Sequence, residues 1–98
     1  MSISLPLDKL TEWLELGIRI SDTARSMLAD TLNLEPQKEE DAEFLYAVSY
    51  EAAKRVLKDL LSQDPDMDLT MNEELADKVI KLLSEHIGHI LEEIMQSR

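Results

Sequence analysis

Three aspartates alternate with other residues between two amphipathic segments of the chain. The stretch reads DPDMDLTMNEEL, so that Asp64, Asp66 and Asp68 stand at every second position and two glutamates follow. Carboxylate oxygens are the ligands that calcium and magnesium prefer in proteins. The spacing indicates a candidate divalent-cation loop, and the alternative is a polar turn that leads into an acid-rich helix start.

The stretch resembles the calcium loop of EF-hand proteins in its first half only. Asp64, Asp66 and Asp68 fill the first, third and fifth positions of that loop. Leu69 replaces the glycine that makes the sharp turn, and Leu75 replaces the bidentate glutamate that closes the site. We therefore favour the polar turn and expect at most a weak divalent site.

The only two histidines of the chain share a helix face with a glutamate. His86, His89 and Glu93 are spaced by three and four residues, which places them on one side of a helix. Such a trio holds zinc or another transition metal when a further ligand is supplied. No neighbouring residue supplies one, so we favour a histidine pair at the helix boundary, assisted by Glu93, and expect no metal.

The sequence lacks cysteine and the short motifs that define common active sites. There is no cysteine, no glycine-flanked serine elbow, no phosphate-binding loop and no dinucleotide fingerprint. Three helices joined by short loops also leave little pocket volume. We therefore expect a protein that is not an enzyme and that carries no cofactor.

The charge balance narrows the possible partners. The chain has 21 acidic and 10 basic residues, for a net charge of −11. This charge repels nucleic acid and anionic membranes and favours basic proteins. The N-terminus lacks the basic start and apolar core of a signal peptide, and no apolar run approaches the ~18 residues that span a bilayer. We expect a cytoplasmic protein that binds neither nucleic acid directly nor membrane.

Three amphipathic segments must position these side chains. Apolar and small residues recur at spacings of three and four over residues 7–32, 37–62 and 71–96. The short connections between the segments favour antiparallel neighbours. We therefore predict an all-α fold with a single helical domain over residues 1–98, built as an antiparallel three-helix up-down-up bundle.

The ends and the apolar stripes of these helices follow from local patterns. Pro6 and Pro36 stand at the first two helix starts, and Thr70 with Glu73 has the form of a capping box ahead of the third. The stripe of the second helix is Ala42, Leu45, Ser49, Ala52, Val56 and Leu60. The third helix shows a heptad pattern of Ala76, Ile80, Leu83, Ile87, Ile90 and Ile94.

The first predicted helix carries more apolar surface than a three-helix bundle needs. One stripe contains Leu10, Leu14, Gly17, Ser21, Ala24 and Leu28, and a second contains Trp13, Leu16, Ile20, Thr23 and Met27. Together they form an arc of roughly 200°. We assign the first stripe to the core and assign Trp13, Leu16, Ile20 and Met27 to a contact with a partner. The alternative is that these four residues are ordinary core.

These features favour a small acidic protein that works by binding another protein through apolar helix faces. It would act as an adaptor, an inhibitor or a secretion-type chaperone, and we expect a homodimer. One alternative is an inhibitor that mimics nucleic acid with its carboxylates. Against it, the acids gather at residues 35–43 and 64–77, which an up-down-up bundle places at opposite ends. The other alternative is a helix-loop-helix protein that binds a divalent cation weakly.

Overall fold

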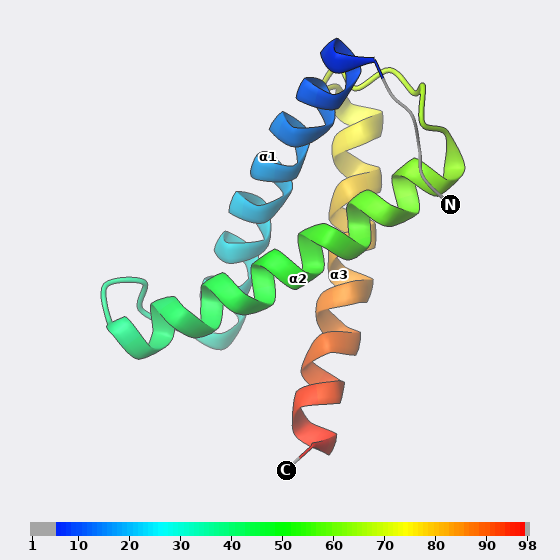
Figure 1. Ribbon diagram of the computed structural model, residues 1–98. Helices are drawn as coiled ribbons and strands as arrows, with labels where there is room; N and C mark the ends of the chain where they lie inside the picture. The colour runs from blue at the N-terminus through cyan, green and yellow to red at the C-terminus, as the bar shows by residue number, and fades with distance from the viewer. Residues whose placement is uncertain (1–5, 98) are drawn as a thin grey trace.

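The computed structural model describes residues 6–97, which form three α-helices and no strand. Helix α1 spans Leu7–Leu32, α2 spans Glu39–Gln63 and α3 spans Glu73–Gln96. Figure 1 shows α2 lying diagonally across α3, with α1 beginning near the start of α3. The packing is most extensive between α1 and α2, less so between α2 and α3, and slight between α1 and α3. The all-α prediction is confirmed, and the packing is consistent with a bundle.

The observed ends of α1 and α2 can be compared with the predicted ones. Helix α1 has the predicted bounds and ends at Asn33, which has a φ of 54° in the left-handed region. Asparagine tolerates this conformation better than most residues, and it lets the N–H of Leu34 reach the Ala29 carbonyl at 3.0 Å. Helix α2 starts two residues later than predicted, because Lys38 donates its N–H to the Glu35 carbonyl in a turn.

The N-cap of α3 differs from the predicted capping box. Asn72 is the cap, and its side-chain oxygen accepts the N–H of Leu75 at 2.9 Å. The N–H of Thr70 is held instead by the Asp68 carboxylate at 2.9 Å. Asparagine caps helices at least as well as threonine, so the helix begins at Glu73 rather than at residue 71.

One continuous core joins the three helices. Its α2 side follows the predicted stripe, with Leu45, Ser49, Ala52, Val56 and Leu60 buried and Ala42 half-buried. The one buried polar side chain among the described residues is Ser49, and its hydroxyl donates to the Tyr46 carbonyl at 3.1 Å. The core therefore contains no unpaired side-chain polar atom in the part of the chain described.

In the first half of α1 the roles of the two stripes are the reverse of those expected, whereas Ala24 and Leu28 are buried as predicted. The buried residues of α1 are Trp13, Leu16, Ile20, Ala24 and Leu28. Leu10 and Leu14, which the sequence assigned to the core, are 43% and 61% exposed. The physical reason is that an amphipathic pattern does not specify on which side the neighbouring segments will lie: Leu57 of α2 packs beside Gly17, and the loop after α2 accepts the indole N–H of Trp13.

The buried seam of α3 also departs from the predicted heptad. Leu75, Val79, Leu83 and Ile90 are buried, whereas Ile80 is 47% exposed. In the first half of α3 the seam follows a spacing of four residues. Ridges of that spacing pack between helices that cross obliquely, whereas a heptad seam needs nearly parallel helices. The diagonal course of α2 across α3 in Figure 1 accounts for the shift.

Candidate functional site

The carboxylates of the candidate cation loop are engaged by the loop's own backbone. Asp64 accepts the N–H of Asp66 at 3.0 Å, and Asp68 accepts the N–H of Thr70 at 2.9 Å. The Thr70 N–H, together with its hydroxyl, holds the pKa of the Asp68 carboxyl below its ordinary value. Within residues 6–97 no three histidine or acidic side chains come together in a group that could hold a metal ion.

The same loop is anchored to α1 through two side chains. The indole N–H of Trp13 donates to the Pro65 carbonyl at 3.1 Å, and the Lys9 amine donates to the Met67 carbonyl. A buried tryptophan needs a partner for its N–H, and this loop carbonyl provides one. Trp13 therefore fastens the loop between α2 and α3 onto the core, which is a structural role.

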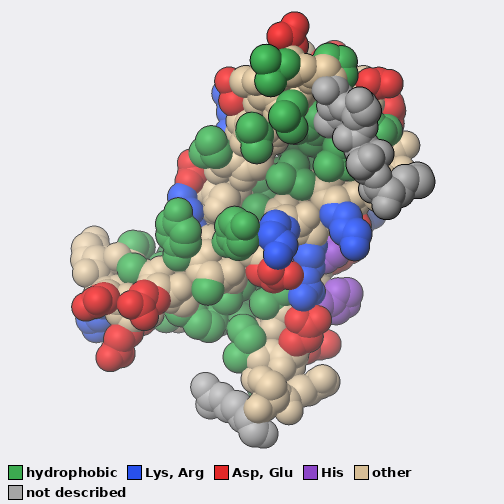
Figure 2. All heavy atoms as spheres, viewed as in Figure 1, with side chains coloured by type: hydrophobic (Ala, Val, Ile, Leu, Met, Phe, Trp, Pro, Cys, Tyr) green, Lys and Arg blue, Asp and Glu red, His purple; other side chains and the backbone are tan. Residues whose placement is uncertain are grey.

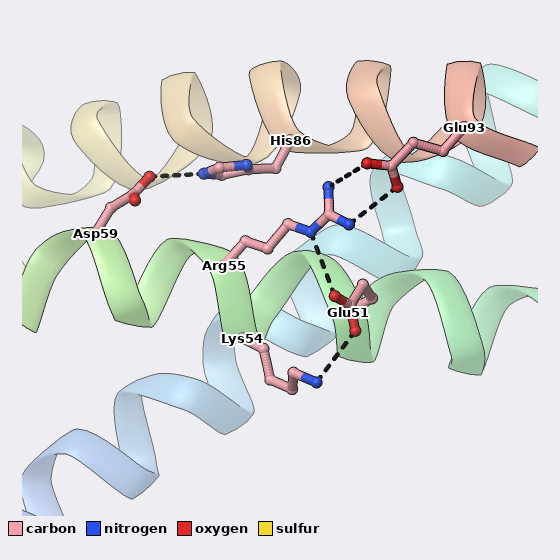
Figure 3. Close-up of polar contacts among 6 residues, drawn as sticks. All are labelled: Glu51, Lys54, Arg55, Asp59, His86 and Glu93. Carbon is pink, nitrogen blue, oxygen red and sulfur yellow. Dashed lines mark hydrogen bonds and ion pairs between the residues drawn. The ribbon is translucent and has the colours of Figure 1, made fainter. Parts of the chain in front are cut away.

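The structure separates the members of the second metal candidate. The ring of His86 contacts the Asp59 carboxylate at 2.6 Å, and Glu93 pairs with Arg55 at 3.0 Å (Figure 3). His89 is exposed and belongs to neither pair. His86 and Glu93 thus each reach across to a different residue of α2, and the shared helix face of the sequence does not become a shared site.

Arg55 and its neighbours form a polar ladder between α2 and α3. Arg55 also pairs with Glu51 at 3.3 Å, four residues earlier on α2, and Lys54 pairs with Glu51 at 3.2 Å (Figure 3). Glu93 and Glu51 raise the pKa of Arg55, and Lys54 and Arg55 lower the pKa of Glu51. The ladder holds two helices together at the surface and leaves these charges engaged with one another.

The four residues expected to contact a partner lie inside the chain's own fold. Trp13 and Leu16 are each 3% exposed, and Ile20 is 1% exposed. Met27 is half-buried and packs against the core. The stripe of Trp13, Leu16 and Ile20 is therefore not available on the surface of the folded chain.

Another set of apolar side chains is exposed in its place, along the neighbouring faces of α1 and α2. We call this set the α1–α2 face, and it comprises Leu10, Leu14, Ile18, Tyr46 and Tyr50. Ile18 is 64% exposed and Tyr46 is 65% exposed. Figure 2 shows apolar side chains gathered over α1 and the adjoining part of α2. The wide arc predicted for the first helix includes Leu10 and Leu14, but the sequence analysis assigned both to the core and did not single out Ile18, Tyr46 or Tyr50.

The α1–α2 face surrounds a groove of about 430 Å³. Leu14, Gly17 and Ile18 line it from α1, and Tyr46, Tyr50 and Leu57 line it from α2. The two helices come close at its floor, because a Cβ atom on Gly17 would lie 3.0 Å from Cδ1 of Leu57. Gly17 thus permits the close approach between the two helices at this point.

Two cations lie over the tyrosines of this groove. The Arg25 guanidinium is 5.4 Å from the centre of the Tyr46 ring, and the Lys54 amine is 5.5 Å from the centre of the Tyr50 ring. Contacts of this kind are attractive and orient both groups. The groove therefore has an apolar floor and charged edges, an arrangement typical of surfaces that bind other proteins.

The acid-rich helix starts lie far apart. Figure 1 places the start of α2 at the lower left of the view and the start of α3 at the top. Glu39, Glu40 and Asp41 begin the first of these helices, and Glu73 and Glu74 begin the second. Their carboxylates make no continuous stripe within one copy of the chain.

No helix within residues 6–97 combines the length and the apolar character needed to cross a membrane. Comparison with known proteins finds no family model that matches the chain, no similar curated protein and no similar solved structure.

Proposed function

We propose that this protein is an antiparallel up-down-up helical module that works by binding another protein through the α1–α2 face. The partner is either a different protein, for which the module acts as an adaptor, inhibitor or secretion-type chaperone, or a second copy of the chain. The observation that carries the proposal is the exposure of large apolar side chains on two adjoining helices. Leu14, Ile18, Tyr46 and Tyr50 are 61%, 64%, 65% and 59% exposed.

Water contact at such a surface is unfavourable, and covering it stabilises a complex. Each large apolar side chain contributes about 1.5–3 kcal/mol when it passes from exposed to buried. Tyrosine suits an interface, because its ring buries apolar area while its hydroxyl finds a polar partner. By contrast, the histidines and acids that the sequence offered for chemistry are mostly engaged in ion pairs and turns. We therefore propose a binding role rather than a catalytic one.

Photo-crosslinking from inside the groove tests this proposal. A benzophenone amino acid replaces Ile18 in the full chain, and the same residue replaces Lys81 on α3 as the control, since both side chains are exposed. In cells that make the protein, we expect one protein to be crosslinked from position 18 and not from position 81. That protein should bind the purified chain and should no longer bind a folded Ile18→Glu variant. Equal crosslinking from both positions, or none from position 18, contradicts the proposal.

A further inference from the structure

The two edges of the groove carry opposite charge. Asp8, Glu15 and Asp22 are exposed and spaced by seven residues, so they follow one line along α1 beyond Ile18. Lys54 and Lys58 are exposed and spaced by four residues, so they follow one line along α2 beyond Tyr50. A line of acids on α1, in which Asp22 is paired with Arg25, and a line of lysines on α2 thus lie on either side of the same apolar floor, in a chain whose net charge is −11.

Glu15 and Lys58 stand out among these charges. Asp22 pairs with Arg25, and Lys54 pairs with Glu51, but Glu15 and Lys58 form no ion pair with any residue of the described range 6–97. They also lie at the same level of the groove. Gly17 packs beside Leu57 at the floor, Glu15 is two residues from Gly17, and Lys58 follows Leu57.

We infer that the groove is covered by a second copy of the chain, related to the first by a two-fold axis that runs along the groove. This axis places α1 of each copy over α2 of the other. Leu14 and Ile18 then lie over the partner's Leu57, and Glu15 faces the partner's Lys58 at the same level. Tyr46 and Tyr50 cover a part of the partner's α1 further along the groove. The inference rests on the proposed function and names the partner of that same face.

Self-complementary charge is what favours a second copy over a different protein. A two-fold interface uses the same patch twice, so the patch must complement itself. One acidic and one basic edge on opposite sides of an apolar floor meet that condition.

The net charge of each copy opposes association, but the opposing charges lie elsewhere. The acid-rich starts of α2 and α3 are outside the groove lining. At physiological salt, repulsion between exposed charges falls off over about 8 Å. Apolar contacts and closely matched edge charges in the groove therefore outweigh the repulsion between the remote acids.

Charge reversal on the two edges tests the arrangement. Glu15→Lys gives each edge the same positive sign at this level, and Lys58→Glu gives each edge the same negative sign. Sedimentation equilibrium at about 150 mM salt measures the dimer dissociation constant of the wild type, of each variant and of their equimolar mixture. We expect a dimeric wild type, variants that self-associate at least about tenfold more weakly, and a mixture that recovers wild-type affinity. Recovery follows because both contacts of the mixed dimer join opposite charges.

Two charge reversals on α3 serve as controls for the reversals at the groove. Glu85→Lys and Lys81→Glu make the same charge changes at exposed positions of α3 and should leave the dissociation constant unchanged. Circular dichroism should show wild-type helicity in all four variants.

A wild type with the 11.2 kDa mass of one chain at about 100 µM overturns the inference. A dimer whose reversed variants show no recovery on mixing also overturns it. If the crosslinker at position 18 captures a different protein while the wild type remains a single chain, the proposed function stands and the dimer fails.

Discussion

The Glu51 carboxylate at the surface of α2 is stabilised in its charged form by two cations. Lys54 and Arg55 of its own helix bind its carboxylate, and Arg55 reaches on to Glu93 of α3. These cations lower the pKa of Glu51, so the folded chain favours its charged form more than the unfolded chain does. The stabilising effect is present at neutral pH and is lost as the pH falls through the folded-state pKa, which lies below the ordinary value of 4.5.

We predict that Glu51→Gln lowers the melting temperature at about pH 7 and that its difference from wild type shrinks as the pH falls below 4.5 toward about 3. The control is Glu85→Gln, which makes the same change in net charge at an exposed glutamate outside any ion pair of the described chain. Thermal melts followed by circular dichroism give both comparisons. A deficit for Glu51→Gln that is as large at pH 3 as at pH 7 would show that the cations are not its cause.

At this scale the sequence shows which residues share a helix but not which pairs form between helices. Glu51 and Arg55 are four residues apart on α2, a spacing that favours an ion pair. The spacing of His86 and Glu93 correctly placed them on one helix. Their partners Asp59 and Arg55 come from α2, and only the packing of two helices determines which side chains meet across it.

At the scale of the helices, ends fixed by backbone geometry were easier to predict than ends fixed by competing caps. Pro6 precedes α1 and Asn33 ends it in a left-handed conformation, so its bounds match the prediction. Before α3, both Thr70 and Asn72 could cap the helix. The Asp68 carboxylate decides between them because it takes the Thr70 N–H, and this contact depends on the folded loop.

We predict that Asn72→Ala lowers the free energy of unfolding by about 1 kcal/mol, the usual cost of losing a side-chain N-cap. The Leu75 N–H then loses its partner at the start of α3. Thr70→Ala, which removes the hydroxyl of the expected capping box, should cost less than half as much. Urea denaturation of both variants measures the two values. A larger loss for Thr70→Ala would show that the capping box forms in solution.

At the scale of the whole molecule, the central feature is the division of α1 into a buried and an exposed apolar face. Its sequence has two stripes of similar strength, and either could face the core. The sequence therefore predicted an apolar excess and a surface for a partner, but it placed Trp13 and Ile20 outside and Leu14 inside. The packing of the other segments decides the matter: the loop between α2 and α3 accepts the Trp13 N–H, and the groove beside Leu57 leaves Leu14 exposed.

The most direct measurement of this division compares two glutamate substitutions on the same helix, two residues apart. Ile20 is 1% exposed and Ile18 is 64% exposed. An unpaired buried carboxylate costs several kcal/mol, a large part of the ~5–15 kcal/mol that stabilises a small domain. Far-UV circular dichroism at 25 °C should therefore show that Ile20→Glu loses most of the helical signal while Ile18→Glu retains it. A folded Ile20→Glu chain, or an Ile18→Glu chain that unfolds even in isolation from any partner, would contradict the account.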